Sequence, residues 1–173
     1  MKSIALVGFM GSGKSTVGPL LAERQGRPFL DLDSIAERLA GKTVSEVFSG
    51  EGESGWRLWE SRALAEAVGT GVPSVLACGG GVVLDSKNRD ILRQSFLTIY
   101  LETSEAVLIE RLRGNSGRPL LAVGEPEAAI AELLKGRRAL YEAAAHLIIT
   151  TDLKNPTEVA DEVEAAVAKL TGA

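Results

Sequence analysis

A glycine-rich segment directly after a short apolar run constrains this chain more than any other feature. Residues 8–16 read GFMGSGKST and follow the apolar residues 4–7. The pattern G-x-x-x-x-G-K-[ST] is typical of a phosphate-binding loop, because its glycines let backbone N–H groups turn toward phosphate oxygens. A Gly/Ser-rich turn without a ligand is the alternative, but helical periodicity follows the segment. We therefore expect a strand, an anion-binding loop and a helix whose N-terminus faces the anion.

Individual residues of this loop have distinct expected roles. We expect the Lys14 ammonium to reach the β- and γ-phosphates of a nucleotide, and the Ser15 hydroxyl to ligate Mg²⁺. The residues expected to bind the nucleotide phosphates are Gly11, Ser12, Gly13, Lys14, Ser15 and Thr16.

Short apolar segments alternate with longer helical patterns along the chain. Strands are predicted at residues 3–8, 28–31, 74–78, 96–101 and 147–150, and helices at 14–25, 34–40, 44–69, 86–94, 104–112, 126–145 and 156–170. This alternation predicts an α/β fold in which a five-stranded parallel sheet has helices on both faces. The 173 residues contain no internal repeat and no dividing linker, so we expect one domain over residues 1–173.

The composition limits which binding partners and which cellular compartment are expected for this chain. The chain has 19 basic and 23 acidic residues, one cysteine and the single His146. The acidic balance argues against nucleic acid, one cysteine excludes an internal disulfide, and one histidine excludes His-pair zinc motifs. With only three residues before the apolar run 4–7 and no apolar stretch of spanning length, we expect no signal peptide and no membrane contact. A cytoplasmic monomer is the expectation.

A phosphate-binding loop alone does not separate kinases from GTPases or transporter ATPases. The D-x-x-G and N-K-x-D patterns of GTPases are absent from the sequence, and so is the L-S-G-G of transporter ATPases. Small phosphoryl-transfer enzymes remain, and these need an acceptor pocket and a mobile cover.

Two carboxylates follow the second predicted strand. In Asp31-Leu32-Asp33, strand alternation places both acids on one side. Because ligands of such sheets bind beyond the carboxyl ends of strands, Asp31 is expected at Mg²⁺ and Asp33 at a substrate hydroxyl. The alternative is that Asp33 or Ser34 only caps the helix over 34–40.

Three glycines follow the third predicted strand. Gly79, Gly80 and Gly81 allow a ligand to approach the backbone closely, whereas a flexible turn is the alternative. The adjacent Cys78 is expected to be a small buried residue.

Arginines at two places suit anionic groups. Arg57 and Glu60 share a helix face at i,i+3, and the flanking tryptophans favour a partly buried guanidinium suited to a carboxylate over an exposed ion pair. Residues 111–124 contain Arg111, Arg113 and Arg118 but no acid, which predicts a lid over polyphosphate; a solvated basic loop is the alternative. Of the neighbouring Arg137 and Arg138, one can face the cleft and the other water.

Taken in order, these segments resemble the shikimate kinase family. That family carries a phosphate loop, D-x-D, F-R-x-x-E, G-G-G, R-P-L-L and R-x-P-L-Y, which stand here at residues 8–16, 31–33, 56–60, 79–81, 118–121 and 137–141. Two positions depart from the family pattern: Trp56 replaces phenylalanine and Ala139 replaces proline.

The resemblance implies that ATP phosphorylates the 3-hydroxyl of shikimate, with Mg²⁺ as cofactor. It implies that Arg57 and Arg137 hold the substrate carboxylate, and that Asp33 and Gly79 to Gly81 meet the ring hydroxyls. It further implies that Arg118 bridges the phosphates, that Arg111 packs on adenine, and that Lys154 lies on the adenine side. The catalytic set is then Lys14, Asp33 and Arg118, with a substrate-binding segment over 33–61 and a lid over 112–124. A gluconate-type kinase of hydroxy acids and a nucleotide-binding module without turnover are the alternatives.

Overall fold

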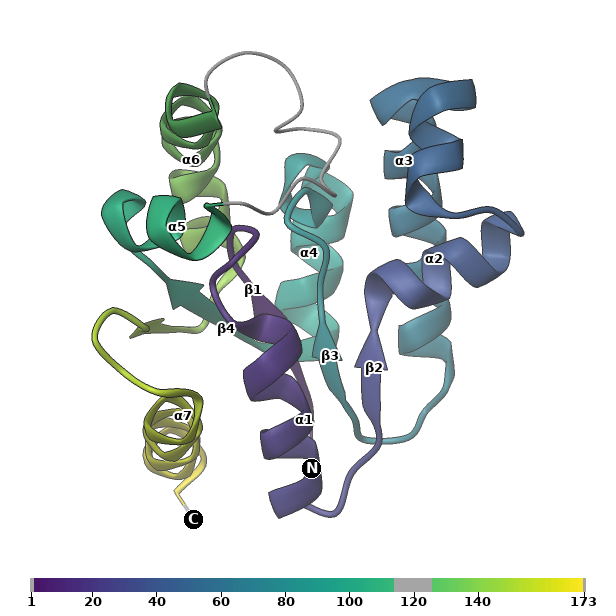
Figure 1. The fold of residues 1–173 in the computed structure, drawn as a ribbon. Helices are drawn as coiled ribbons and strands as arrows, with labels where there is room; N and C mark the ends of the chain where they lie inside the picture. Colours follow the sequence, from purple (N-terminus) through teal and green to yellow (C-terminus); the bar gives the residue numbers. More distant parts are fainter. Residues whose placement is uncertain (1, 114–125, 173) are drawn as a thin grey trace.

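The structure is a computed structural model that describes residues 2–113 and 126–172 (Figure 1). Its five-stranded sheet has the order β2-β3-β1-β4-β5, and every pairing is parallel. The strands are β1 (Ser3–Val7), β2 (Phe29–Asp31), β3 (Val75–Ala77), β4 (Phe96–Glu102) and β5 (Leu147–Thr150). The predicted parallel sheet is therefore confirmed, with each strand end within one residue of its expected place.

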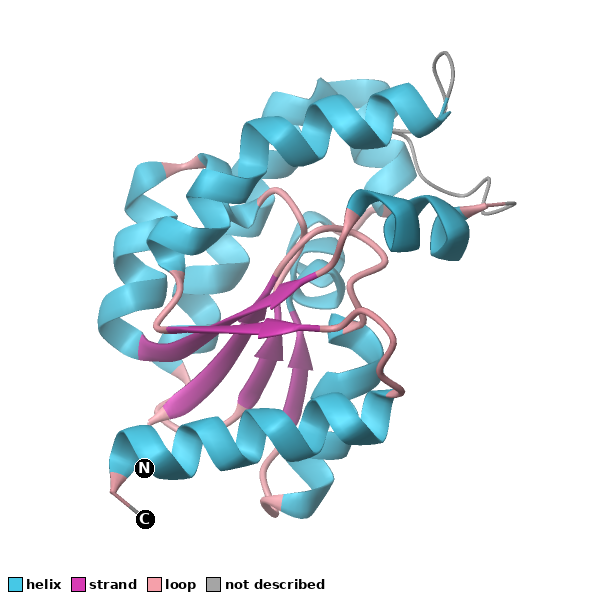
Figure 2. Cartoon of the chain, turned by 90° about the vertical axis from the view of Figure 1, so that its left-hand side faces the viewer, coloured by secondary structure: helices cyan, strands magenta, loops and turns pink. Residues whose placement is uncertain are grey.

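Helices lie on both faces of this sheet (Figure 2). They are α1 (Lys14–Arg24), α2 (Leu32–Ala40), α3 (Val44–Gly69), α4 (Ser86–Ser95), α5 (Glu105–Leu112), α6 (Pro126–Ala144) and α7 (Pro156–Thr171). A short 3₁₀ turn, η1 (Val82–Leu84), was not predicted. None of the described helices is long and apolar enough to cross a membrane.

Strand alternation divides the core into two halves. In β1, Ile4 and Leu6 pack with α1 and α7 on one face, whereas Ala5 and Val7 belong to the cluster on the other face. All four are at most 1% exposed. Burying each of the larger aliphatic side chains contributes about 1.5–3 kcal/mol. The sheet is thus covered on both faces, as a parallel sheet requires.

Strand register places three carboxyl ends at one edge of the sheet. Ala77 of β3 pairs with Leu6 of β1 on one side and with Asp31 of β2 on the other. The segments that follow these strands therefore begin side by side, which brings residues distant in sequence to one site.

The helix α3 is not continuous. Its N-terminus carries a capping box, in which Thr43 accepts from the Glu46 backbone N–H and Glu46 accepts from that of Thr43. At Gly52, however, φ is 71° and the helix is interrupted. The prediction of one helix over 44–69 is right in its ends but missed this break. Figure 1 shows α2 and α3 beside the β2 edge of the sheet.

Candidate active site

The loop between β1 and α1 has the backbone that a phosphate-binding loop needs. Gly11 and Gly13 have φ of 82° and 99°, a region that residues with a side chain rarely adopt. At Gly8 there is also no room for a side chain, because a Cβ would lie 2.7 Å from the Leu101 carbonyl oxygen. These glycines let the chain turn tightly into the N-terminus of α1.

Lys14 lies within this loop and is only 8% exposed. Its Nζ donates to the carbonyl oxygens of Gly8, at 2.9 Å, and Phe9, at 2.8 Å. The ammonium is thereby held inside the curve of the loop, at the place expected for a cation that meets phosphate oxygens.

A cleft of about 330 Å³ opens next to the loop. It brings together the predicted nucleotide, metal and hydroxyl residues of three strand ends: Gly11, Gly13, Lys14, Ser15, Thr16, Asp31, Asp33, Gly79 and Gly80. Ser12, also expected to bind phosphate, lines an adjoining hollow of about 230 Å³.

Asp31 and Asp33 both lie at the cleft, but strand alternation, the predicted reason, does not place them there. The strand ends at Asp31, and α2 already begins at Leu32, so strand alternation does not place Asp33. Asp31 is the N-cap of α2, since its Oδ1 accepts from the Ser34 N–H at 3.0 Å. The capping alternative was thus right about a cap but wrong about its residue, and both carboxylates still line the cleft.

Asp33 is open to the cleft but flanked by protein on its other sides. Loss of water contact raises the pKa of Asp33, and the nearby Asp31 charge acts in the same direction, while Lys14 and Arg57 oppose the rise. A carboxylate with a raised pKa is a better proton acceptor near neutral pH.

The glycines after β3 separate charged groups. A Cβ on Gly79 would lie 2.6 Å from Asp33 Oδ1 and closer still to Glu60 Oε1, and one on Gly81 would overlap the guanidinium of Arg57. Gly80 packs against the phosphate-binding loop, where a Cβ would lie 3.5 Å from the Met10 nitrogen. At Gly79 and Gly81 the requirement for glycine is therefore steric, and a flexible turn does not explain it, whereas the contact at Gly80 would leave room for a Cβ.

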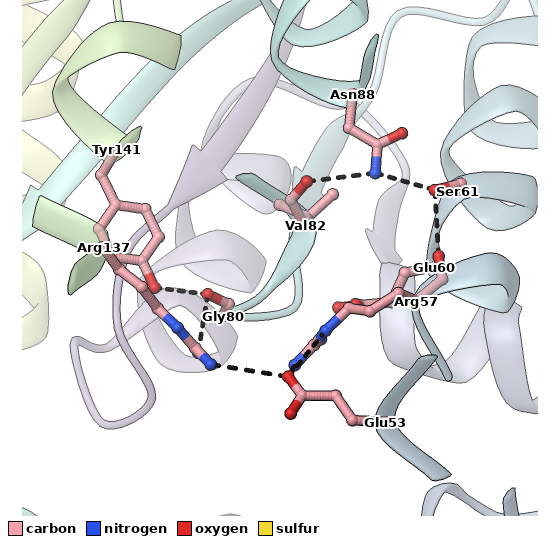
Figure 3. A network of polar contacts seen from close by, with 9 residues as sticks. All are labelled: Glu53, Arg57, Glu60, Ser61, Gly80, Val82, Asn88, Arg137 and Tyr141. Atoms are coloured by element: carbon pink, nitrogen blue, oxygen red, sulfur yellow. Dashed lines mark hydrogen bonds and ion pairs between the residues drawn. The ribbon is translucent and has the colours of Figure 1, made fainter. Parts of the chain in front are cut away.

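Two arginines face each other across this site (Figure 3). Arg57 on α3 donates to Glu60, confirming the predicted i,i+3 pair, and also to Glu53 at 2.7 Å. Arg137 on α6 is 4% exposed and donates to the Gly80 carbonyl at 3.4 Å. Arg138 instead points outward, toward Glu102 at 3.6 Å. Arg137 is thus the arginine that faces the glycine segment and Arg57, although neither of these two arginines lines the cleft of about 330 Å³ itself.

Glu60 is almost fully buried. Burial raises the pKa of Glu60 to about 7, and Asp33 adds to the rise, whereas Arg57 and Arg137 lower it. Its Oε2 accepts from Arg57, but its buried Oε1 has no hydrogen-bond partner among the described residues. Glu60 therefore orients Arg57 at the cost of a poorly solvated carboxyl.

A second network fixes the glycine segment to the helices. Tyr141, one turn after Arg137 on α6, donates to the Gly80 carbonyl. Asn88 donates to Ser61 Oγ at 3.0 Å and to the Val82 carbonyl at 3.1 Å (Figure 3). The replacement of the family's proline by Ala139 does not disturb the helix, because α6 is continuous at this position.

The adenine-side residues also come together. Arg111 donates to the Gly11 carbonyl at 3.2 Å and to the Thr151 carbonyl at 3.1 Å, joining α5 to the phosphate-binding loop and to the end of β5. Arg111 and Lys154 line the hollow of about 230 Å³ on this side of the loop. Arg118 and residues 114–124 of the expected lid lie outside the described residues, and the described Arg113 is exposed.

The donor set suits a hard cation. The Ser15 hydroxyl and the Asp31 carboxylate line the same cleft, and the helix cap engages only one Asp31 oxygen. In the described part of the chain no group of three or more His, Cys, Asp or Glu side chains is placed to hold a metal. A cation here would depend on water and phosphate oxygens, which is the usual environment of Mg²⁺.

Sequence reasoning missed three contributors: Glu53, Tyr141 as a donor to Gly80, and Thr151 as the partner of Arg111. Glu53 had a usable signal, since it lies four residues before Arg57 on a predicted helix, and Tyr141 had one as the tyrosine of the family motif at 137–141. Cys78 is buried, as expected, and burial raises the pKa of its thiol.

Comparison with known proteins identifies the family. A model of the shikimate kinase family matches residues 10–168. A shikimate kinase of Symbiobacterium thermophilum is 44% identical, over 93% of this chain and 93% of its own length. A solved shikimate kinase from Acinetobacter baumannii, in complex with shikimate, superposes with a TM-score of 0.93 at 38% identity, covering 98% of this chain and 94% of that chain. A gluconokinase from Sinorhizobium meliloti, at 24% identity, 98% and 93% coverage and a TM-score of 0.62, shares the fold. This chain belongs to the shikimate kinase family.

Proposed function

We propose that this protein transfers the γ-phosphoryl group of ATP to the 3-hydroxyl of shikimate, giving ADP and shikimate 3-phosphate. The observation that carries the proposal is the placement of Arg57 and Arg137 across the glycine segment from Asp33 and the phosphate-binding loop. Two guanidinium groups suit a substrate carboxylate, while the acid and the loop suit a hydroxyl and a phosphate.

The transfer step follows from these positions. The substrate hydroxyl oxygen forms a bond to the γ-phosphorus as the bond from that phosphorus to the ADP oxygen breaks. Asp33 accepts the hydroxyl proton, and its raised pKa favours this role. Lys14 stabilises the negative charge on the phosphate oxygens.

Mg²⁺ is the proposed metal, held by Ser15 and Asp31 with water and ATP. When bound, it neutralises phosphate charge. We also propose that Arg118 contacts the transferring phosphoryl group, and that the 112–124 segment covers the site while residues 33–61 bind the substrate. Single-turnover transfer and ATP affinity in Arg118→Ala test the first of these roles: a normal chemical rate with weakened ATP binding would reduce Arg118 to a nucleotide anchor.

The wider setting is likewise a proposal. An acidic chain with one cysteine suits a cytoplasmic monomer that acts on small molecules without nucleic acid or membrane. Light scattering of the purified protein tests the monomeric state.

ADP formation with shikimate, gluconate and no acceptor separates the three functions considered. The proposal expects turnover with shikimate and a product phosphorylated at its 3-hydroxyl, identified by NMR. Preferred turnover of gluconate would favour a gluconate-type kinase. ATP binding without ADP formation under any of the three conditions would favour a non-catalytic module.

A further inference from the structure

The acidic side chain of Glu53 lies between Arg57 and Arg137 (Figure 3). Its Oε1 accepts from Arg57 Nη2 at 2.7 Å and from Arg57 Nε at 3.2 Å. The same oxygen is 3.9 Å from Arg137 Nη2. One carboxylate oxygen of the chain itself therefore meets both guanidinium groups.

This arrangement matches the one proposed for the substrate carboxylate. The Arg137 side chain is 5% exposed and the Arg57 side chain 20% exposed, so both charges are largely removed from water. Two such cations need a nearby anion, and Glu60 already engages a different nitrogen of Arg57. Glu53 supplies the missing charge on the side of Arg57 that faces Arg137.

Glu53 can leave this position at small cost. Its side chain is 44% exposed, so a carboxylate that moves outward regains water directly. It also follows Gly52, where the positive φ interrupts α3 and frees the backbone from regular helix geometry. Glu60, at 1% exposure, has no comparable exit.

We propose that Glu53 is an internal counter-ion that holds the carboxylate position between Arg57 and Arg137, and that the substrate carboxylate must displace it. This inference rests on the proposed function. Its consequence is that Glu53 weakens substrate binding and excludes small carboxylates that lack the ring hydroxyls needed to offset the displacement. The competing explanation, that Glu53 stays in place and orients Arg57 for the substrate, predicts the opposite sign.

The test compares Glu53→Gln with the unmodified enzyme at saturating ATP and Mg²⁺. Removing an internal competitor should lower the KM for shikimate roughly three- to tenfold, the scale of one partly exposed ion pair, and leave kcat within about twofold. Glu51→Gln is the matched control: it removes the same charge two residues away, where the carboxylate pairs with Lys42 at 2.9 Å. A raised KM in Glu53→Gln, an unchanged KM, or an equal fall in Glu51→Gln would overturn the proposal.

A second measurement does not depend on shikimate turnover. Acetate binding without ATP, measured by titration calorimetry, should be tighter in Glu53→Gln than in either the unmodified enzyme or Glu51→Gln. Equal acetate titrations in the three proteins would overturn the counter-ion role, even where shikimate kinase activity is intact. Conversely, absence of shikimate turnover in the unmodified enzyme would contradict the proposed function, while the acetate result would still decide the counter-ion role. If Glu53→Gln does not fold, Glu53→Asp, one methylene shorter, should show the same changes at smaller size, and unchanged values would again overturn the proposal.

Discussion

Asp33 and Glu60 both lie against Gly79, so close that a Cβ on this glycine would be 2.6 Å from Asp33 Oδ1 and nearer still to Glu60 Oε1. One carboxyl faces the cleft and the other is buried against Arg57. The missing side chain of Gly79 thus leaves room for both the proposed proton acceptor and the group that orients Arg57.

Gly79→Ala should therefore impair catalysis. The added methyl must push one of the two carboxyls aside, and crowding of this kind costs about 1–3 kcal/mol. We expect kcat/KM for shikimate to fall by roughly ten- to a hundredfold. Gly136→Ala on α6, where a Cβ meets nothing within 4 Å, is the control and should keep both activity and melting temperature. Equal activity in the two variants would show that the Gly79 backbone has room to adjust.

The buried Glu60 should make stability depend on pH in a defined direction. Its pKa is raised from 4.5 to about 7 in the folded protein, so between these values the folded state binds more protons than the unfolded state. Its contribution is fully present below about pH 4.5 and is lost as pH rises through about 7, by at most about 3 kcal/mol. Glu60→Gln has no titrating proton at this position. As the pH rises from about 4.5 to about 7, the unfolding free energy of Glu60→Gln should therefore increase relative to that of the unmodified protein. Urea unfolding of both proteins at several pH values measures the difference, and parallel curves would refute the raised pKa.

Lys14→Met should abolish turnover but not folding. The substitution keeps the length of the side chain but removes the charge that stabilises phosphate oxygens, and such a loss costs at least about a hundredfold in rate. The hydrogen bonds to the Gly8 and Phe9 carbonyls are also lost, which should lower stability by only about 1–2 kcal/mol. Calorimetry beside steady-state assays measures both effects. Loss of the cooperative thermal transition would instead make Lys14 a structural residue.

The two acids after β2 should respond differently to amidation. Asp33→Asn removes the proposed proton acceptor, so the single-turnover rate should fall far more than ATP affinity. Asp31→Asn keeps an oxygen that can cap α2 but weakens a metal ligand, so more Mg²⁺ should be needed for half-maximal rate. An Mg²⁺ titration of both variants distinguishes them, and an unchanged titration in Asp31→Asn would remove Asp31 from the metal site.

The sequence predicted the sheet well because its signals are local. Apolar segments such as 96–101 have few ways to be buried other than as central parallel strands, and the glycine pattern of residues 8–16 requires one kind of loop. The phosphate-binding loop, the two acids and the three glycines could be grouped for the same reason, because they follow strands whose carboxyl ends meet at one edge, whereas the arginines on helices could not.

What the sequence did not determine depends on contacts between elements. Either Asp31 or Asp33 can cap a helix, and the choice of Asp31 follows from where β2 leaves the sheet. The choice of Arg137 over Arg138 depends on the rotation of α6 against the glycine segment, which spacing along one helix does not specify. Glycines at 50, 52 and 55 all weaken α3, and the sequence alone does not indicate that the break falls at Gly52.

Arg57 and Arg137 are proposed to hold the substrate carboxylate and thereby to present the substrate hydroxyl to Asp33 and ATP. The most direct test is kcat/KM for shikimate against its methyl ester, in the unmodified enzyme and in Arg137→Met. We expect the unmodified enzyme to prefer the acid by roughly 2 to 5 kcal/mol, more than about thirtyfold, because the ester would have to displace Glu53 from Arg57 and Arg137 without supplying a negative charge in its place. Arg137→Met should lose most of this preference, chiefly by slower use of the acid. Equal use of acid and ester by the unmodified enzyme would contradict the account.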